Sequence, residues 1–423
     1  MAKKNSNVLA IGIMFFLFFM ISFVTGLQNP MGVIAKAQFN ATNAMSQMGN
    51  FMNFFAYLVL GIPAGLVLKK KGYKFTALTA VAVGFTGVLI SFLSGVFGNY
   101  WVYLLGALVS GFSMCMLNTV VNPLLNTLGG GGNRGNQLIQ MGGSLNSIGA
   151  TLVPILAGYM IGEVTEKTQV ADVNGALFLA MGIFALAFLV ILFSAIPEPE
   201  LEAAKAAPAV QAEGVVDSVK GALKFRHFVL GIVAIFLYLG IEVGIPNIAN
   251  LYMTTGAEGG GLGIAAGIAG TFVGAYWFMM MIGRLTGSAI GGKVSSRAMI
   301  MATSGAGILF LLLAMFLPKS WVITISGNTV PFAIILMVAC GLCTSIMWGA
   351  IFNLAVEGLG KYTSIASGIF MTMVVGGGIL PLVQGFAADH LGFLNSYWLI
   401  IIYLLYLLWY GFSGSRPVNK EAK

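Results

Sequence analysis

The chain has 423 residues, of which 58% are hydrophobic and only 8% are charged, and its mean hydropathy is +0.93. This composition excludes an ordinary soluble globular domain and predicts an all-α protein that spans a bilayer. The net charge of +8 does not indicate nucleic-acid binding, because the basic residues lie in short loops between apolar runs, where they orient membrane segments.

Twelve apolar runs are long enough to cross the hydrocarbon core, which takes roughly 20 residues of helix. In chain order the predicted spans are 8–33, 46–68, 75–97, 100–126, 136–161, 173–195, 227–254, 264–290, 298–318, 330–356, 362–388 and 392–412. We read the first run as a retained helix, because no small-residue cleavage site follows a short apolar core. Of the 21 lysines and arginines, only Lys36, Lys167 and Lys319 are assigned to the side opposite the termini. This bias predicts that both termini are cytoplasmic.

The longest polar connection runs from Pro197 to Arg226 and separates six spans from six. We therefore predict an N-terminal six-helix bundle over 1–196, a cytoplasmic interdomain linker over 197–226 and a C-terminal six-helix bundle over 227–423. Several residues recur at a shared offset of 227 positions: Gly149, Pro154 and Gly158 return as Gly376, Pro381 and Gly385. A shared offset indicates a parallel internal duplication.

A carboxylate lies in the middle of the seventh span. Glu242 belongs to the apolar run 227–254, and an ionisable group at bilayer depth is by default a candidate functional residue. We expect Gly244 and Pro246 to loosen the helix, so that freed carbonyls and the amides of Asn247 and Asn250 join Glu242 around a cation or a polar solute. The alternatives are that Glu242 carries a proton or makes a structural bridge to another span.

Three asparagines follow one face of the fourth span: Asn118, Asn122 and Asn126 are spaced i, i+4, i+8. Amides offer both donors and acceptors, which suits the hydroxyl pattern of a sugar. Interhelical hydrogen bonding is the alternative. We expect Asn118 and Asn122 to contact substrate, with Asn118 also a cation contact, and Asn126 to be structural.

Further polar residues are expected near a central cavity. Gln28 and Asn29 precede Pro30 on the first span, and Gln140 and Asn146 lie on the fifth. Trp348 on the tenth span offers an aromatic face for a sugar ring, although packing is the alternative. We place Arg284 and Glu357 near the cytoplasmic surface, as loop or gating charges.

Several motifs carry a family resemblance. Gly61-Ile-Pro-Ala-Gly65 and Gly283-Arg-Leu-Thr-Gly287 precede Lys-rich loops after the second and eighth spans, and the finer motifs are Asn122-Pro123, Asn146-Ser-Ile-Gly149, Tyr238-Leu-Gly-Ile-Glu-Val243 and Gly376-Gly-Gly-Ile-Leu-Pro381. The chain resembles the major facilitator superfamily, although its loop acid is absent. Within it, the chain is similar to the fucose-proton symporter family and its glucose/galactose branch. The resemblance implies 12 transmembrane helices in two six-helix bundles, with spans one, four, seven and ten around the cavity. For Arg284 and Glu357 it favours inter-helix contacts that hold one conformation.

In the fucose-transporting members a carboxylate is expected on spans one and four, where this chain has Asn29 and Asn118. Amides do not titrate, so sodium is preferred to the proton as coupling ion, with Asn29, Asn118 and Glu242 as its ligands. We predict a secondary active transporter that imports a neutral hexose such as glucose, galactose or mannose by cation symport. Its expected substrate contacts are Gln28, Asn118, Asn122, Gln140, Asn146, Glu242, Asn247 and Trp348.

We expect a monomer in a bacterial inner membrane, with no cofactor besides the coupling ion. An uncoupled sugar uniporter and a major facilitator exporter of another small molecule are the alternatives within transport. A sugar sensor would carry an appended signalling domain, and none is recognisable here. A membrane enzyme would need a catalytic constellation, which the sequence does not show.

Overall fold

The computed structural model describes residues 7–23, 38, 43–161, 170, 174–199, 201–202, 215–264, 266–318, 320–325 and 328–417. Within this part of the chain, nine helices are long and apolar enough to cross a membrane, and Asn7–Phe23 is a shorter apolar helix. One of the nine, Met48–Phe97, contains two predicted spans, and the fifth span is an additional helix, Gly132–Ile161. The prediction of an all-α protein with 12 membrane helices is confirmed.

The first half of the chain contributes the unlabelled helix Asn7–Phe23 and four labelled ones: α2 (Asn43–Phe97), α3 (Tyr100–Leu128), α4 (Gly132–Ile161) and α5 (Asn174–Phe193). The label α2 covers two helices that meet at Gly72, whose φ of 84° lies in the region that favours glycine. The second and third spans are therefore joined without an intervening loop.

Two sets of capping hydrogen bonds connect the start of the third span with the end of the sixth. The Glu198 carboxylate accepts hydrogen bonds from the backbone N–H groups of Tyr73 (2.7 Å) and Lys74 (2.8 Å) at the start of the third span. In the other direction, Lys74 Nζ donates to the carbonyls of Leu192 (2.8 Å) and Ser194 (2.9 Å) at the end of α5. The negative carboxylate lies at the positive N-terminal end of one helix dipole, and the positive ammonium group lies at the negative C-terminal end of another. Each contact is therefore stabilising.

The second half begins after the short helix α7 (Val215–Leu223). Its helices are α8 (Arg226–Thr254), α9 (Ala266–Ile290), α10 (Ser296–Phe316), α11 (Phe332–Thr344), α12 (Met347–Ala355), α13 (Thr363–Thr372), α14 (Gly376–Leu391) and α15 (Phe393–Trp409). The shorter elements are the 3₁₀ helices η2 (Ala257–Gly259), η3 (Gly360–Tyr362) and η4 (Met373–Val375) and the short π-helix η5 (Tyr410–Gly414). The tenth span is thus α11 followed by α12, and the eleventh is α13 and α14 joined by η4.

A small β-hairpin between α10 and α11 was not expected from the sequence. Strand β1 (Val322–Ile325) pairs with β2 (Asn328–Pro331) in antiparallel register, with Ile323 opposite Val330. The β-branched residues of this stretch favour extended backbone.

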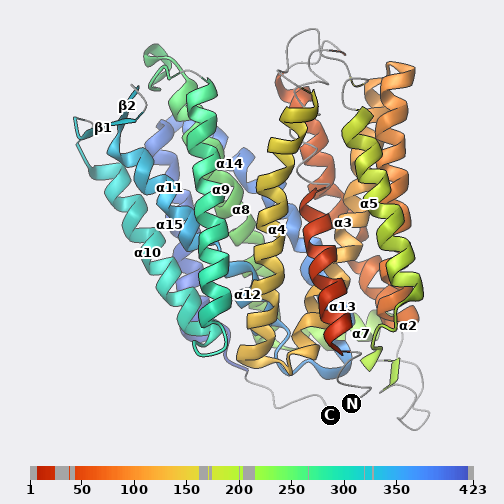
Figure 1. Ribbon diagram of the computed structural model, residues 1–423. Coiled ribbons are helices and arrows are strands. Elements are labelled where there is room, and N and C mark those ends of the chain that lie inside the picture. The colour runs from red at the N-terminus through yellow and green to blue at the C-terminus, as the bar shows by residue number, and fades with distance from the viewer. Residues whose placement is uncertain are drawn as a thin grey trace.

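Both ends of the chain lie at the same end of the molecule, which we call the termini side, and the two groups of helices diverge toward the opposite end (Figure 1). Contacts of α2 with α13 and of α4 with α9 join the halves, and we call these contacts the seam. Glycines allow the backbones to meet there: a Cβ added at Gly368 would lie 2.5 Å from the Gly61 carbonyl oxygen and 2.8 Å from Gly65 Cα. The domain boundaries at 196 and 227 remain predictions.

Candidate substrate and coupling site

The asparagines of α3 form a hydrogen-bonded ladder with a tyrosine of α2. Asn118 Nδ2 donates to Tyr57 Oη at 2.9 Å, and Asn122 Nδ2 donates to the Asn118 carbonyl at 2.9 Å and to Asn118 Oδ1 at 3.3 Å. Both amides are buried. The predicted shared helical face is therefore present, and it faces other helices instead of lipid.

The indole of Trp348 extends this ladder into the second half. Trp348 Nε1, at the start of α12, donates to Asn122 Oδ1 at 3.2 Å. Its ring packs edge-on against Tyr238 of α8, with centroids 6.4 Å apart, and against Phe370 of α13, with centroids 6.1 Å apart. We call Tyr57, Asn118, Asn122 and Trp348 the amide–indole cluster. It combines amide and hydroxyl groups with an aromatic face, as sites for small polar ligands do.

Glu242 lies near the middle of α8 and is paired with a cation. Arg284 Nη2 of α9 is 3.2 Å from Glu242 Oε1, and the two side chains are only 12% and 11% exposed. The placement of Arg284 near the cytoplasmic surface is therefore wrong. Its Cα does lie toward the termini-side end of α9, but the long side chain carries the guanidinium inward to the carboxylate.

The Arg284 guanidinium also reaches across the seam to α4. Its Nη1 donates to Ser147 Oγ at 2.8 Å, to the Gly143 carbonyl at 3.2 Å and to Asn146 Oδ1 at 3.4 Å. Its Nε donates to the Ser345 carbonyl at 3.3 Å. One charged group therefore joins three membrane segments, α8, α9 and α4, and touches the turn between α11 and α12.

The helix that carries Glu242 is continuous, contrary to the expected loosening at Gly244 and Pro246. Pro246 has no N–H to donate to the carbonyl of Glu242, four residues earlier. Tyr276 Oη of α9 replaces that donor at 3.1 Å, and it also lies 3.0 Å from Thr344 Oγ1. A side chain from a neighbouring helix thus satisfies the freed carbonyl, so the helix continues through the proline.

The other predicted residues have varied surroundings. Gln140 is buried, and its Nε2 donates to the Ile346 carbonyl at 2.7 Å across the seam, while Asn146 Nδ2 donates to the Phe18 carbonyl at 3.0 Å. Asn247 is exposed. Gln28 and Asn29 lie outside the described residues. Glu357 pairs with Arg297 at 3.6 Å, with both side chains over a third exposed, which agrees with its expected surface position.

The predicted sodium ligands have separate partners in the described structure. Asn118 is bonded to Tyr57, and Glu242 is bonded to Arg284. In the part of the chain that is described, no group of three or more His, Cys, Asp or Glu side chains could hold a metal ion.

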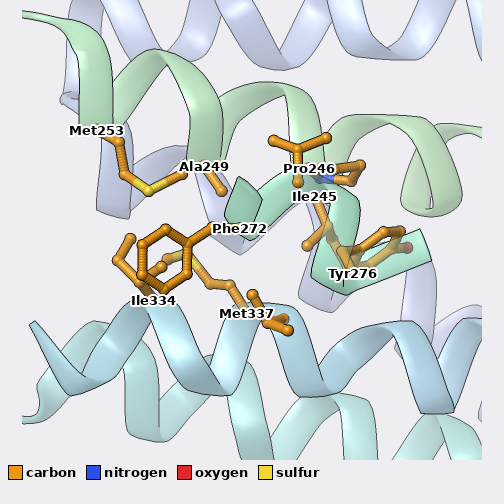
Figure 2. Close-up of a pocket in the computed structure, with 10 residues that line it drawn as sticks. Ile245, Pro246, Ala249, Met253, Phe272, Tyr276, Ile334 and Met337 are labelled. Atoms are coloured by element: carbon orange, nitrogen blue, oxygen red, sulfur yellow. The ribbon is translucent and has the colours of Figure 1, made fainter. Parts of the chain in front are cut away.

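A small cavity lies beside Pro246, between α8, α9 and α11. Its volume is about 10 Å³, and its lining, which includes Met253, Phe272 and Ile334, is almost wholly apolar. The Tyr276 hydroxyl points away from these side chains (Figure 2). This volume is about that of one water-sized probe, so the cavity is a packing defect beside the proline and is too small for a sugar.

Sequence reasoning missed Tyr57, Tyr276 and the inward direction of Arg284. The spacing of the two tyrosines in the sequence does not distinguish them, because a single aromatic residue in a membrane helix is usually interpreted as a packing residue. Arg284 did carry a signal: it is a full charge inside a predicted span, which usually faces a partner or a cavity.

The model of the family described as Major Facilitator Superfamily matches residues 14–380, so the chain belongs to this superfamily. It is therefore a membrane transporter and not an enzyme. The chain is 28% identical to a protein named glucose/galactose transporter from Brucella abortus, over 95% of this chain and 92% of that one. It is 23% identical to the L-fucose-proton symporter of Escherichia coli, over 92% and 89% of the two chains.

The fold is also similar to a crystal structure of a major facilitator superfamily transporter in the outward conformation. The TM-score is 0.82, with 20% identity, and the match covers 97% of this chain and all of that one. This likeness shows that the two chains share one fold.

Proposed function

We propose that this protein is a secondary active transporter that imports a neutral hexose, such as glucose, galactose or mannose, by cation symport. It works as a monomer in a bacterial inner membrane, with both termini in the cytoplasm. Alternating access comes from rocking of the two halves about the central site. The contacts of the seam, α2 with α13 and α4 with α9, support a present state in which the termini side is closed. The names of the similar proteins, glucose/galactose transporter and fucose-proton symporter, support a sugar as substrate.

The amide–indole cluster carries the proposal. Its polar atoms are neutral, which suits a substrate without charge, and they come from both halves, so a bound solute contacts α3 and α12 together. A hexose that displaces the Trp348–Asn122 hydrogen bond takes up the indole donor and the amide acceptor with its own hydroxyl groups. Binding by both halves is the arrangement that lets a substrate influence their rocking.

Glu242 is the proposed coupling group. The sequence favoured sodium as the coupling ion. Arg284 supplies a positive charge to this carboxylate in the present state, and either a sodium ion or a proton has to compete with it. A sodium ion needs several oxygen ligands, whereas a proton needs only the carboxylate itself. The Asn118 amide donates to Tyr57 and to the Met114 carbonyl, and among the described residues it makes no hydrogen bond to Glu242. We therefore favour the proton as coupling ion, with sodium as the alternative.

Purified protein in liposomes tests the proposal. Uptake of radiolabelled hexoses is measured under an inward proton gradient, an inward sodium gradient and neither. Accumulation under the proton gradient supports proton symport, and accumulation under the sodium gradient alone moves the assignment to sodium. Equilibration without accumulation under either gradient indicates a uniporter, and no hexose movement at all refutes sugar transport.

The site is tested by comparing two asparagines. Asn122→Ala removes an amide of the cluster, and we expect the apparent KM for hexose to rise about tenfold, because one good hydrogen bond to substrate is lost. Asn395→Ala is the control: its amide donates to the Leu391 carbonyl at 2.9 Å, the same local bond that Asn122 makes, but on the exposed face of α15. Equal effects of the two substitutions would count against the cluster.

A further inference from the structure

We infer that Arg284 is a positioning residue that transmits the charge state of Glu242 to the seam, so that loss of the Glu242 charge opens the termini side. This inference uses the proposed function only in taking Glu242 as the coupling group. The inference rests on the hydrogen bonds of one guanidinium, that of Arg284. It donates to a carboxylate in its own half and to three acceptors on α4 in the other half.

The acceptors around Arg284 differ in charge. Ser147, Asn146, Gly143 and Ser345 offer neutral oxygens, and Glu242 offers the carboxylate. Glu242 in turn is faced by Arg284 from α9 and by the neutral phenol of Tyr238 on its own helix, with Tyr276 at its backbone carbonyl. A buried cation whose counter-charge is removed is strongly unfavourable where it stands. Neutral acceptors alone do not compensate for that charge.

The seam offers a way to relieve this imbalance. When α4 and α9 separate, water reaches the guanidinium and replaces the hydrogen bonds to α4. Loss of the Glu242 charge therefore favours the state in which the termini side is open. Because the Arg284 side chain is 12% exposed rather than wholly buried, we expect the shift in the conformational equilibrium to be about tenfold to a hundredfold.

A disulfide across the seam reports this equilibrium. A Cβ added at Gly291 would lie 3.5 Å from Gln137 Cβ, which is within the range of disulfide-bonded cysteines. It would also lie 2.7 Å from the carbonyl oxygen of Gly287 in the same segment, so Gly291→Cys shifts the local backbone and every rate is compared within the reporter chain. The reporter chain carries Gln137→Cys and Gly291→Cys, with a protease site inserted between 203 and 214. After oxidation and cleavage the two halves remain together on a non-reducing gel only where the disulfide has formed. The native cysteines Cys115, Cys340 and Cys343 are buried.

Three variants of the reporter chain test the inference. Glu242→Gln leaves Arg284 as a lone charge, and we expect the rate of crosslinking to fall at least tenfold. Adding Arg284→Met removes that charge, and crosslinking is expected to recover severalfold over Glu242→Gln alone. Glu258→Gln is the matched control, because this glutamate is exposed in η2 at the other end of the molecule, and it should crosslink as the unmodified reporter does.

A purely structural role for Glu242 predicts a different pattern, in which the double variant is as impaired as the single one or more so. That result, or an equal loss in the Glu258→Gln control, overturns the inference. If Glu242→Gln gives no monodisperse protein, the same comparison is made on folded yield, and failure of the double variant as well overturns it. Glu242→Asp, which keeps the charge, is expected to retain crosslinking.

The crosslinking requires neither sugar nor an ion gradient, so it separates this inference from the proposed function. A protein that transports no hexose but shows the expected recovery in the double variant refutes the function and supports the role of Arg284. A protein that accumulates hexose but shows no recovery in the double variant supports the function and refutes the role of Arg284.

Discussion

Replacing one glycine in the seam should shift the balance between the two access states. Gly368 of α13 lies against α2, and a Cβ at this position would be 2.5 Å from the Gly61 carbonyl oxygen, 2.8 Å from Gly65 Cα and 2.9 Å from Gly65 N. All three are backbone atoms, which no rotamer change can move. Gly368→Ala therefore requires α2 and α13 to separate by roughly 0.5–1 Å before ordinary van der Waals contact is restored.

The expected size follows from overpacking, which costs about 1–3 kcal/mol where neighbouring groups cannot yield. Because the clash exists only while the termini side is closed, that free energy favours the open state, by a factor of roughly 5 to 150. Crosslinking of Gln137→Cys with Gly291→Cys measures the closed state directly. The melting temperature in detergent should change little, because the two helices belong to different halves.

Gly385→Ala on α14 provides the control, since a Cβ there meets nothing within 4 Å. We expect this variant to crosslink like the parent. The reasoning is refuted if Gly368→Ala crosslinks as fast as Gly385→Ala. It is also refuted if Gly368→Ala lowers the melting temperature by several degrees relative to Gly385→Ala, because the clash would then act within one half.

Three further outcomes are expected. Tyr276→Phe removes the donor to the carbonyl freed by Pro246 and should reduce the free energy of unfolding by about 1–3 kcal/mol in thermal melts. The loss should be smaller in a Pro246→Ala background, where a backbone N–H is restored to that carbonyl. Equal losses in both backgrounds would contradict this account. Glu198→Gln keeps the shape of the side chain but weakens the charged cap on the third span, so limited proteolysis should cut the 197–226 linker faster than in the parent protein. Trp348→Phe keeps an aromatic ring but loses the indole donor, and we expect a rise of about fivefold or more in the apparent KM for hexose with little change in melting temperature; an unchanged KM would make this tryptophan a packing residue.

The membrane helices could be predicted from sequence because the bilayer imposes a length and a composition that each helix must meet on its own. The amide ladder was equally accessible: the i, i+4 spacing of Asn118 and Asn122 fixes a shared face whatever surrounds it. Neither inference depends on how distant helices are arranged.

The features that escaped prediction depend on that arrangement. Arg284 was placed at the surface because its position along α9 was judged without the reach and direction of its side chain. The loosening expected at Pro246 failed for a related reason, since the hydroxyl of Tyr276, 30 residues along the chain, supplies the missing donor. The local sequence pattern identified Pro246 and Arg284 as unusual residues. Their effects depend on side chains from other helices, which sequence periodicity does not reveal.

The exchange of caps between Glu198 and Lys74 has a consequence for dividing the protein into two pieces. The carboxylate that caps the third span belongs to the chain just beyond α5, so a first fragment that ends before Glu198 leaves the N–H groups of Tyr73 and Lys74 without that acceptor. A first fragment that extends past Glu202 keeps it. Co-expressed fragments broken after Glu202 should therefore reassemble into transporter better than fragments broken at Ile196, even though both breaks fall outside the membrane spans.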